Sequence, residues 1–108
     1  MKIYIIIPII LFLSGLTTLI ISTKKINNFI GYRTKNSMKN EKNWKFANEK
    51  SGILLMRFGI LSFLFGTIFL SLKEINSFIY SDNIFVLINI ILIFATIFVT
   101  ESDLKKQF

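Results

Sequence analysis

Apolar residues along this chain form three long blocks that polar segments separate. The blocks cover residues 3–22, 53–72 and 78–100. A bilayer core of about 30 Å needs about 20 helical residues. The first two blocks supply this length outright, and the third, which is purest over 84–99, supplies it with its flank. None of the blocks alternates strictly, three strands cannot close a barrel, and helices satisfy every backbone amide in lipid. The pattern therefore predicts an all-α membrane protein with three transmembrane helices.

The predicted helices separate one long polar segment, one short loop and a tail. We place the helices at about 3–23, 52–72 and 84–100, the segments between them at 24–51 and 73–83, and the tail at 101–108. The segment 24–51 carries eight basic residues against two glutamates, whereas 73–83 carries one lysine against two acidic residues. Short loops rich in Lys and Arg stay in the cytoplasm. We therefore predict a cytoplasmic basic loop, an outer 73–83 loop, an N-terminus outside and a cytoplasmic C-terminus.

The composition agrees with a membrane protein and narrows its chemistry. The chain has 108 residues, 53% of them apolar, with a mean hydropathy of +0.62, and this length predicts one domain, 1–108. The first block is longer than the apolar core of a signal peptide, and no small-x-small cleavage site precedes Lys24, so we expect a retained helix. Since Cys and His are absent, we expect no disulfide, no metal site and no cofactor.

The net charge of +7 is mainly a signal of topology. A nucleic-acid interface is not expected, because the lysines lack a recognised binding fold around them. Anionic lipid headgroups attract such lysines without a specific partner. Membrane lipid is therefore the expected partner, and the sequence is compatible with an oligomer.

Small residues at helical spacing predict how the helices pack. Gly52, Gly59 and Gly66 lie seven residues apart, with Ser62 between the last two. Such a face lets a neighbouring backbone approach closely. The first helix offers a matching narrow face, which we place at Ser14, Gly15, Thr18 and Ser22.

Two polar residues fall inside the predicted membrane helices. Arg57 lies near the end of the second helix, where it can snorkel to the headgroups or pair with a loop carboxylate, or else line a functional polar pocket. Asn89 lies deeper, where it can form an interhelical hydrogen bond or contact a ligand. No Asp or Glu falls within a predicted membrane core, which counts against a proton-coupled transporter.

The basic segment also has a local order of its own. Gly31 permits a tight turn as the chain leaves the membrane, and Ser37 or Asn40 can cap a helix that begins near Met38. From there, apolar and small residues at three- and four-residue steps run into the second membrane helix. Trp44 is expected at headgroup level, where an indole is half apolar and half hydrogen-bonding.

Residues of this segment, in this order, resemble the SdpI family of bacterial membrane proteins. The residues that carry the resemblance are Gly31, Tyr32, Arg33, Thr34, Ser37, Asn40, Glu41, Trp44, Ala47, Asn48 and Gly52. The best-known family member is an immunity protein that protects a producing cell from a secreted cannibalism toxin, and it is described as a receptor that sequesters an autorepressor. That protein has further helices ahead of this domain. The resemblance implies a multi-pass protein of the bacterial plasma membrane.

Three functions stay open at this point. The first is an immunity or toxin-resistance protein that binds a membrane-active peptide toxin, or shields its target, and signals through the loop to a repressor or other cytoplasmic partner. The second is a structural or regulatory protein whose basic loop docks a cytoplasmic partner or anionic lipid. The third is a small transporter or a membrane enzyme. We expect no enzyme, since Arg33, Glu41 and Glu49 are the only plausible catalytic groups and are more simply explained by salt bridging or capping.

Among the motif residues, Arg33 and Glu41 allow two interpretations. They can pair across the turn into the helix, which would make the motif a clasp that stabilises the fold. Alternatively, the planar guanidinium of Arg33 binds an external ligand through two parallel hydrogen bonds.

Overall fold

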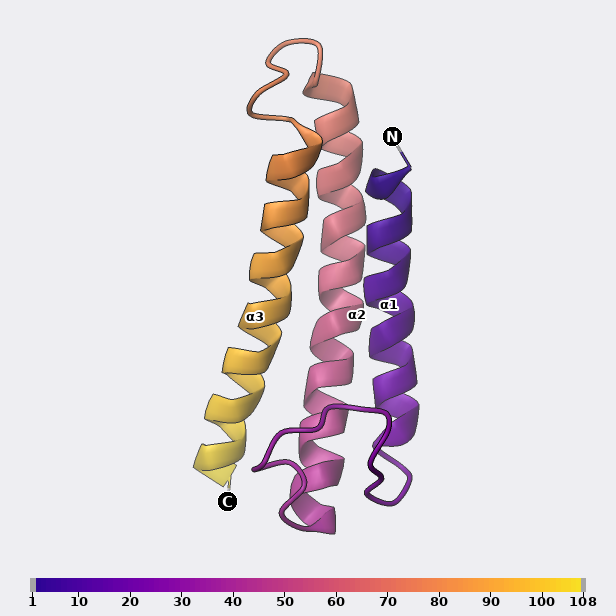
Figure 1. The fold of residues 1–108 in the computed structure, drawn as a ribbon, viewed down its shortest axis with the longest axis vertical. Helices are drawn as coiled ribbons and strands as arrows, with labels where there is room; N and C mark the ends of the chain where they lie inside the picture. The colour runs from indigo at the N-terminus through magenta and orange to yellow at the C-terminus, as the bar shows by residue number, and fades with distance from the viewer. Residues whose placement is uncertain (1, 108) are drawn as a thin grey trace.

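The computed structural model describes residues 2–107 and consists of three long helices that lie side by side (Figure 1). They are α1 (Ile3–Ile21), α2 (Glu41–Leu72) and α3 (Asp82–Gln107). Each is long and apolar enough to cross a membrane, so the prediction of an all-helical protein with three spanning helices is confirmed. The chain runs along α1, back along α2 and forward again along α3.

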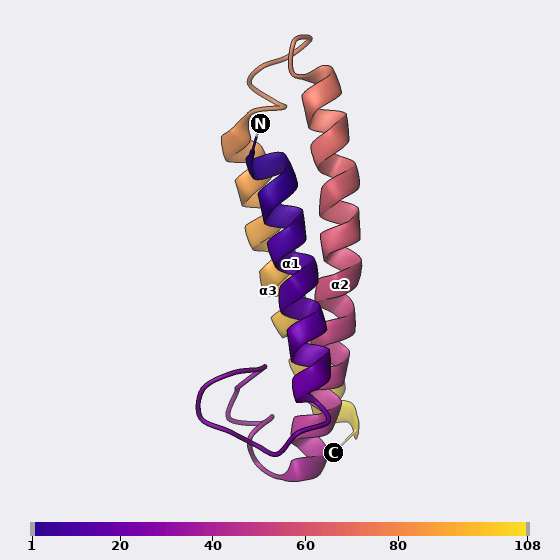
Figure 2. The same ribbon diagram turned by 90° about the vertical axis from the view of Figure 1, so that its right-hand side faces the viewer.

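The two ends of this bundle differ, and we name them by their connections. At the loop end, α1 ends, α2 begins and α3 ends. The long connection there covers residues 22–40, because the second half of the predicted loop 24–51 belongs to α2, and from here on the name basic loop refers to 22–40. At the far end, α1 begins and the shorter connection 73–81 joins α2 to α3. The basic loop folds back over the first turns of α2, as both views show (Figure 2).

Helix α2 is the centre of the fold because it packs along both other helices, whereas α1 and α3 touch each other little. A Cβ added at Gly52, Gly59 or Gly66 would lie 2.8 Å from a backbone atom of α1. Side chains at these positions would force the two helices apart, so the predicted small-residue face of α2 is confirmed. Ser62 belongs to another contact, since its hydroxyl donates to Asn89 Oδ1 of α3 at 2.5 Å.

The predicted face of α1 is only partly right. Gly15 lies at the contact, where an added Cβ would be 2.6 Å from the carbonyl oxygen of Gly52. Ser14 is exposed, and Thr18 returns its hydroxyl to the Ser14 carbonyl. A strict four-residue step drifts around a helix of 3.6 residues per turn, so the buried face instead alternates steps of four and three. Its members are Tyr4, Pro8, Leu11 and Gly15.

Two helix ends differ from the predicted bounds. Helix α2 begins at Glu41, where Asn40 Oδ1 accepts a hydrogen bond from the Asn43 backbone N–H. Asn40 is therefore the cap, and the helix runs without a break from the loop into the apolar span. Helix α3 continues to Gln107. Residues 101–107 of the predicted tail 101–108 are therefore helical and carry Glu101 on a fixed backbone, and residue 108 lies outside the described residues.

Candidate functional site

The basic loop is held against α2 by a buried asparagine. Asn48 Oδ1 accepts a hydrogen bond from the Tyr32 backbone N–H at 2.6 Å, while Asn48 Nδ2 donates to the Tyr32 carbonyl at 3.3 Å. The same Nδ2 donates to the Trp44 carbonyl at 3.0 Å, and the Asn48 side chain is fully buried. One amide thus satisfies both backbone groups of Tyr32 and fixes the loop to the helix.

Gly31 is the residue that allows this close approach. Its φ is +111°, a conformation that L side chains rarely adopt. A Cβ at this position would lie 2.7 Å from Asn48 Oδ1 and 3.3 Å from the Trp44 ring atom Cη2. Both the backbone angle and the lack of space therefore require glycine where the chain turns toward Tyr32.

A second polar centre stabilises the turn that follows. The buried Ser37 hydroxyl oxygen accepts a hydrogen bond from the Thr34 backbone N–H at 2.8 Å and lies 3.0 Å from the carbonyl oxygen of Tyr32. Thr34 Oγ1 accepts from the Ser37 backbone N–H at 3.2 Å. A further bond runs from Asn43 Nδ2 of α2 to the Asn36 carbonyl at 3.0 Å. Most of the polar motif residues thus serve to hold this loop in one conformation.

Three alternate loop residues converge on one carboxylate of α3. The hydroxyls of Tyr32 and Thr34 donate to Glu101 Oε2 at 2.8 Å and 2.9 Å, and Asn36 Nδ2 donates to Glu101 Oε1 at 3.1 Å. All three donors are neutral, and the ion pairs of the structure within residues 2–107 do not include Glu101. We call Glu101 and its three donors the Glu101 clasp.

The phenol of Tyr32 responds to this environment. Its pKa is raised above the ordinary value of 10.0, first because burial disfavours the phenolate and then because Glu101 accepts its proton in a hydrogen bond and repels a second negative charge. Tyr32 therefore remains a hydrogen-bond donor over the whole physiological pH range.

The residues between the three donors face away from the clasp. Arg33 and Lys35 are exposed, whereas the three donors Tyr32, Thr34 and Asn36 are only partly exposed. The suggested Arg33–Glu41 pair is wrong, since the ion pairs among the described residues are Lys50–Asp103 and Lys73–Asp82. The motif is nevertheless a clasp, made by neutral donors on Glu101 instead of by an arginine.

Trp44 lies beneath the loop. It is fully buried, as is Ala47 one turn further along α2, and its Nε1 has no hydrogen-bond partner within the described part of the chain. The turn at Gly31 covers the indole, so the ring contacts the protein, and its position at headgroup level stays a prediction. The large apolar ring provides the surface on which the loop packs.

The two polar residues of the membrane helices have separate surroundings. Asn89 accepts from Ser62 and donates its Nδ2 to the Phe85 carbonyl at 2.8 Å, both deep in the bundle. Of the two predicted uses of Asn89, the structure therefore shows the interhelical hydrogen bond. Arg57 is exposed on the surface of α2, away from the Glu101 clasp.

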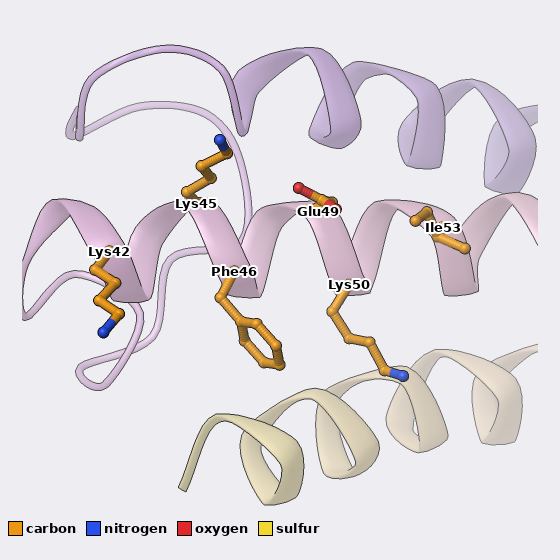
Figure 3. Close-up of a pocket in the computed structure, with 6 residues that line it drawn as sticks. All are labelled: Lys42, Lys45, Phe46, Glu49, Lys50 and Ile53. Atoms are coloured by element: carbon orange, nitrogen blue, oxygen red, sulfur yellow. The ribbon is translucent and has the colours of Figure 1, made fainter. Parts of the chain in front are cut away.

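A hollow of about 350 Å³ opens on α2 beside the end of α3 (Figure 3). In it, Phe46 and Lys50 point toward α3, and Lys50 pairs with Asp103 at 3.1 Å. Lys45 and Glu49 point toward the opposite side, where α1 lies. The hollow is lined by Lys42, Lys45, Phe46, Glu49, Lys50 and Ile53.

Taken together, these features define a multi-pass helical membrane protein whose basic loop is fixed to α2 by Asn48 and to α3 by Glu101. The model of the SdpI/YfhL protein family matches residues 23–101, which is well over half of the chain. The chain therefore belongs to the SdpI/YfhL protein family. Among curated proteins and among solved structures, no match to this chain is found.

The matched range has a clear relation to the structure. It begins just after α1, contains the basic loop and all of α2, and ends at Glu101. The motif residues and the carboxylate that two of them, Tyr32 and Thr34, bind are thus all inside the family segment. The sequence did not predict Glu101 as a site residue. The local signal for a shared acceptor is the group of neutral hydrogen-bond donors at Tyr32, Thr34 and Asn36, which does not by itself identify the acceptor.

Proposed function

We propose that this chain is a bacterial plasma-membrane immunity protein of the SdpI type that confers resistance to a membrane-active peptide toxin. Family membership supports an immunity-type membrane function at the level of the family. The excess of lysine and arginine at the loop end supports an orientation with the basic loop and the C-terminus in the cytoplasm and the N-terminus outside.

The observation that carries the proposal is the connection between the basic loop and α3. Helix α3 packs on α2 and touches α1 little, so a large part of its apolar surface is open to lipid or to an inserted peptide. A peptide that binds there and shifts α3 also shifts Glu101. Because Tyr32 and Thr34 bind this carboxylate, the displacement reaches the outward-facing Arg33 between them. Helix α3 thereby connects toxin binding within the membrane to a signal in the cytoplasm.

The test is protection of living cells. The full chain is expressed in a bacterial strain that is sensitive to several secreted membrane-active peptides, and survival and membrane depolarisation are measured after challenge. We expect higher survival and slower depolarisation than in cells with an empty vector. Glu101→Leu should lower the protection. Asp103→Asn on the same helix breaks the partly exposed ion pair to Lys50, which contributes little, and should retain the protection. Unchanged killing by every related toxin would contradict the proposed resistance.

Signalling is tested separately from resistance. Arg33→Lys keeps the charge and the topology but loses the planar guanidinium, and the exposed position of Arg33 makes the change harmless to the fold. We expect normal membrane levels and normal resistance, together with weaker capture of a cytoplasmic partner by photo-crosslinking from position 35. An equal yield of crosslinked partner from wild type and from Arg33→Lys would contradict a role of Arg33 in signalling.

A second function is favoured by the same outward face. Arg33 and Lys35 are exposed on a loop that is held in place, and their two positive charges form a suitable surface for an acidic cytoplasmic protein in the absence of any toxin. The side chains that hold the loop are Ser37, Asn43, Asn48 and Glu101. In that case the crosslinked partner should be recovered from unchallenged cells, and expression should leave toxin killing unchanged.

A further inference from the structure

A second basic feature lies at the loop end, and the proposed function does not use it. Where α1 ends, the chain turns away and leaves a hollow of about 450 Å³ between the end of α1 and the first turns of α2. We call it the lysine hollow. It is lined by Ser22, Thr23, Lys24, Lys25, Glu41 and Lys45.

The lysine hollow has an excess of positive charge. Three ammonium groups face one carboxylate, and the side chains of Lys24, Lys25 and Lys45 are exposed. The ion pairs found within residues 2–107 lie elsewhere, at Lys50 and at Lys73. Lys45 points toward the α1 side of α2, whereas Lys50 points to α3 (Figure 3). The lysine hollow can therefore accept an anion without breaking an existing ion pair.

The end of α1 itself opposes an anion, and the balance has to be considered. A helix C-terminus carries about half a negative charge on its last carbonyls. Here the hydroxyls of Ser22 and Thr23 donate to the carbonyls of Leu19 and Ile20, at 2.5 Å and 2.7 Å. Three ammonium groups outweigh the remaining dipole and the carboxylate of Glu41, so the hollow remains attractive to an anion. Glu49 points to the same side of α2 as Lys45 but does not line the hollow.

The position of the lysine hollow identifies the kind of anion. It begins directly after Ile21, the last residue of an apolar helix long enough to cross a membrane. On α1, Leu16 and Ile20 are exposed one turn apart and lead toward the hollow. A ligand at this place meets lysines at its head and an apolar helix surface along its tail. Basic pockets between helices at a membrane boundary are typical sites for the headgroups of anionic lipids.

We propose that the lysine hollow binds the phosphate of an anionic phospholipid, with an acyl chain lying along Leu16 and Ile20. Lys24 and Lys25 come from the end of α1, and Lys45 comes from α2. The bound headgroup therefore bridges the two helices where the basic loop leaves the membrane. This site is independent of toxin resistance and of the Glu101 clasp.

The test uses the full chain reconstituted in vesicles of phosphatidylcholine with and without phosphatidylglycerol, extracted in mild detergent and analysed by native mass spectrometry. We expect the wild-type protein to retain phosphatidylglycerol in preference to phosphatidylcholine. Lys24→Gln/Lys25→Gln should lower this preference by about thirtyfold, since each lysine near a membrane surface contributes about 1 kcal/mol. Lys45→Gln, on a different helix, should lower it as well.

The matched control is Lys105→Gln/Lys106→Gln, which removes two adjacent exposed lysines from the same end of the molecule. It should retain the preference for phosphatidylglycerol. An equal loss in both double variants would show diffuse attraction, and no loss in either would exclude the hollow, so both results overturn the proposal. Displacement of the lipid by added inorganic phosphate would also overturn it, because the ligand would then be a soluble anion.

Discussion

The two ends of α3 are attached to the rest of the protein by the same chemical pair in different surroundings. At the far end, the Tyr4 hydroxyl donates to Asp82 Oδ1 at 2.6 Å. At the loop end, the Tyr32 hydroxyl donates to Glu101 at 2.8 Å. Asp82 also pairs with Lys73 at 2.8 Å, whereas the donors on Glu101 are neutral. An ion pair thus supports one tyrosine–carboxylate contact, and a folded loop supports the other.

The surroundings decide what each contact does. The side chains of Lys73 and Asp82 are 38% and 50% exposed, so water and salt screen their attraction. The far end is held mainly by its aromatic cluster, in which the rings of Tyr4 and Phe85 lie 4.7 Å apart. Within residues 2–107 the buried aromatic cluster lies at the far end and does not include neighbours of Glu101, so at the loop end hydrogen bonds fix the position of the loop. Removing a carboxylate should therefore matter little at the far end and much at the loop end.

Replacing Glu101 by leucine should have the largest effect. Three hydrogen bonds to a charged group are lost together, at a cost of about 3 kcal/mol, which is about a hundredfold in the population of the open loop. Hydrogen exchange at Tyr32 and Thr34, and trypsin cleavage after Arg33 and Lys35, should increase accordingly. Asp103→Asn is the control on the same helix. Equal protection of the loop from hydrogen exchange and trypsin in wild type and in Glu101→Leu would contradict the proposed difference between the two ends of α3.

Replacing Gly31 by alanine should have the next largest effect. The new Cβ would face Asn48 Oδ1 at 2.7 Å, and alanine is strained at a φ of +111°. We expect a loss of about 2 kcal/mol in the stability of the closed loop, again measured by hydrogen exchange. Asn28→Ala, at an exposed position of the same loop, should leave the exchange rates unchanged. If both variants exchange alike, Gly31 is not a strained position.

Some parts of the molecule could be predicted from the sequence alone. The three helices follow from apolar blocks of membrane length, and the face at Gly52, Gly59 and Gly66 follows from helical spacing. The residue types before the helical pattern allowed a cap at Ser37 or at Asn40, and the structure shows the cap at Asn40. Each of these features depends on residues close together in the chain, so one sequence is enough to predict it.

The partner of the loop could not be predicted in the same way. Glu101 lies 65 or more residues from its donors, and it directly follows an apolar block, where a carboxylate is expected to face water. The burial of Trp44 depends on the turn at Gly31, which the local pattern does not determine. Motif residues can be recognised in order along a chain, whereas the group that they bind emerges only when α3 is placed beside them.

A small effect is expected from the far end. Asp82→Asn removes the charge that Lys73 faces but leaves an oxygen that can accept from Tyr4. The thermal stability should change far less than in Glu101→Leu, and the remaining difference from wild type should vanish as the ionic strength rises. Thermal unfolding in detergent at low and high salt measures both quantities. A loss as large as that of Glu101→Leu would mean that the two ends are equivalent.

The smallest effect concerns the protonation of Tyr32. Its pKa is raised in the folded protein by burial and by Glu101, so the folded state binds this proton more tightly than the unfolded state. The resulting stabilisation is fully present below a pH of about 10, the ordinary tyrosine pKa, and is lost as the pH rises through the raised pKa. The difference in phenolate absorbance between wild type and Tyr32→Phe should therefore develop only at a pH above the ordinary tyrosine pKa of about 10. In a Glu101→Leu background the same difference should move back toward the ordinary pKa. A difference signal centred at 10 or below in the wild-type background would show that the Glu101 clasp does not hold this phenol in solution.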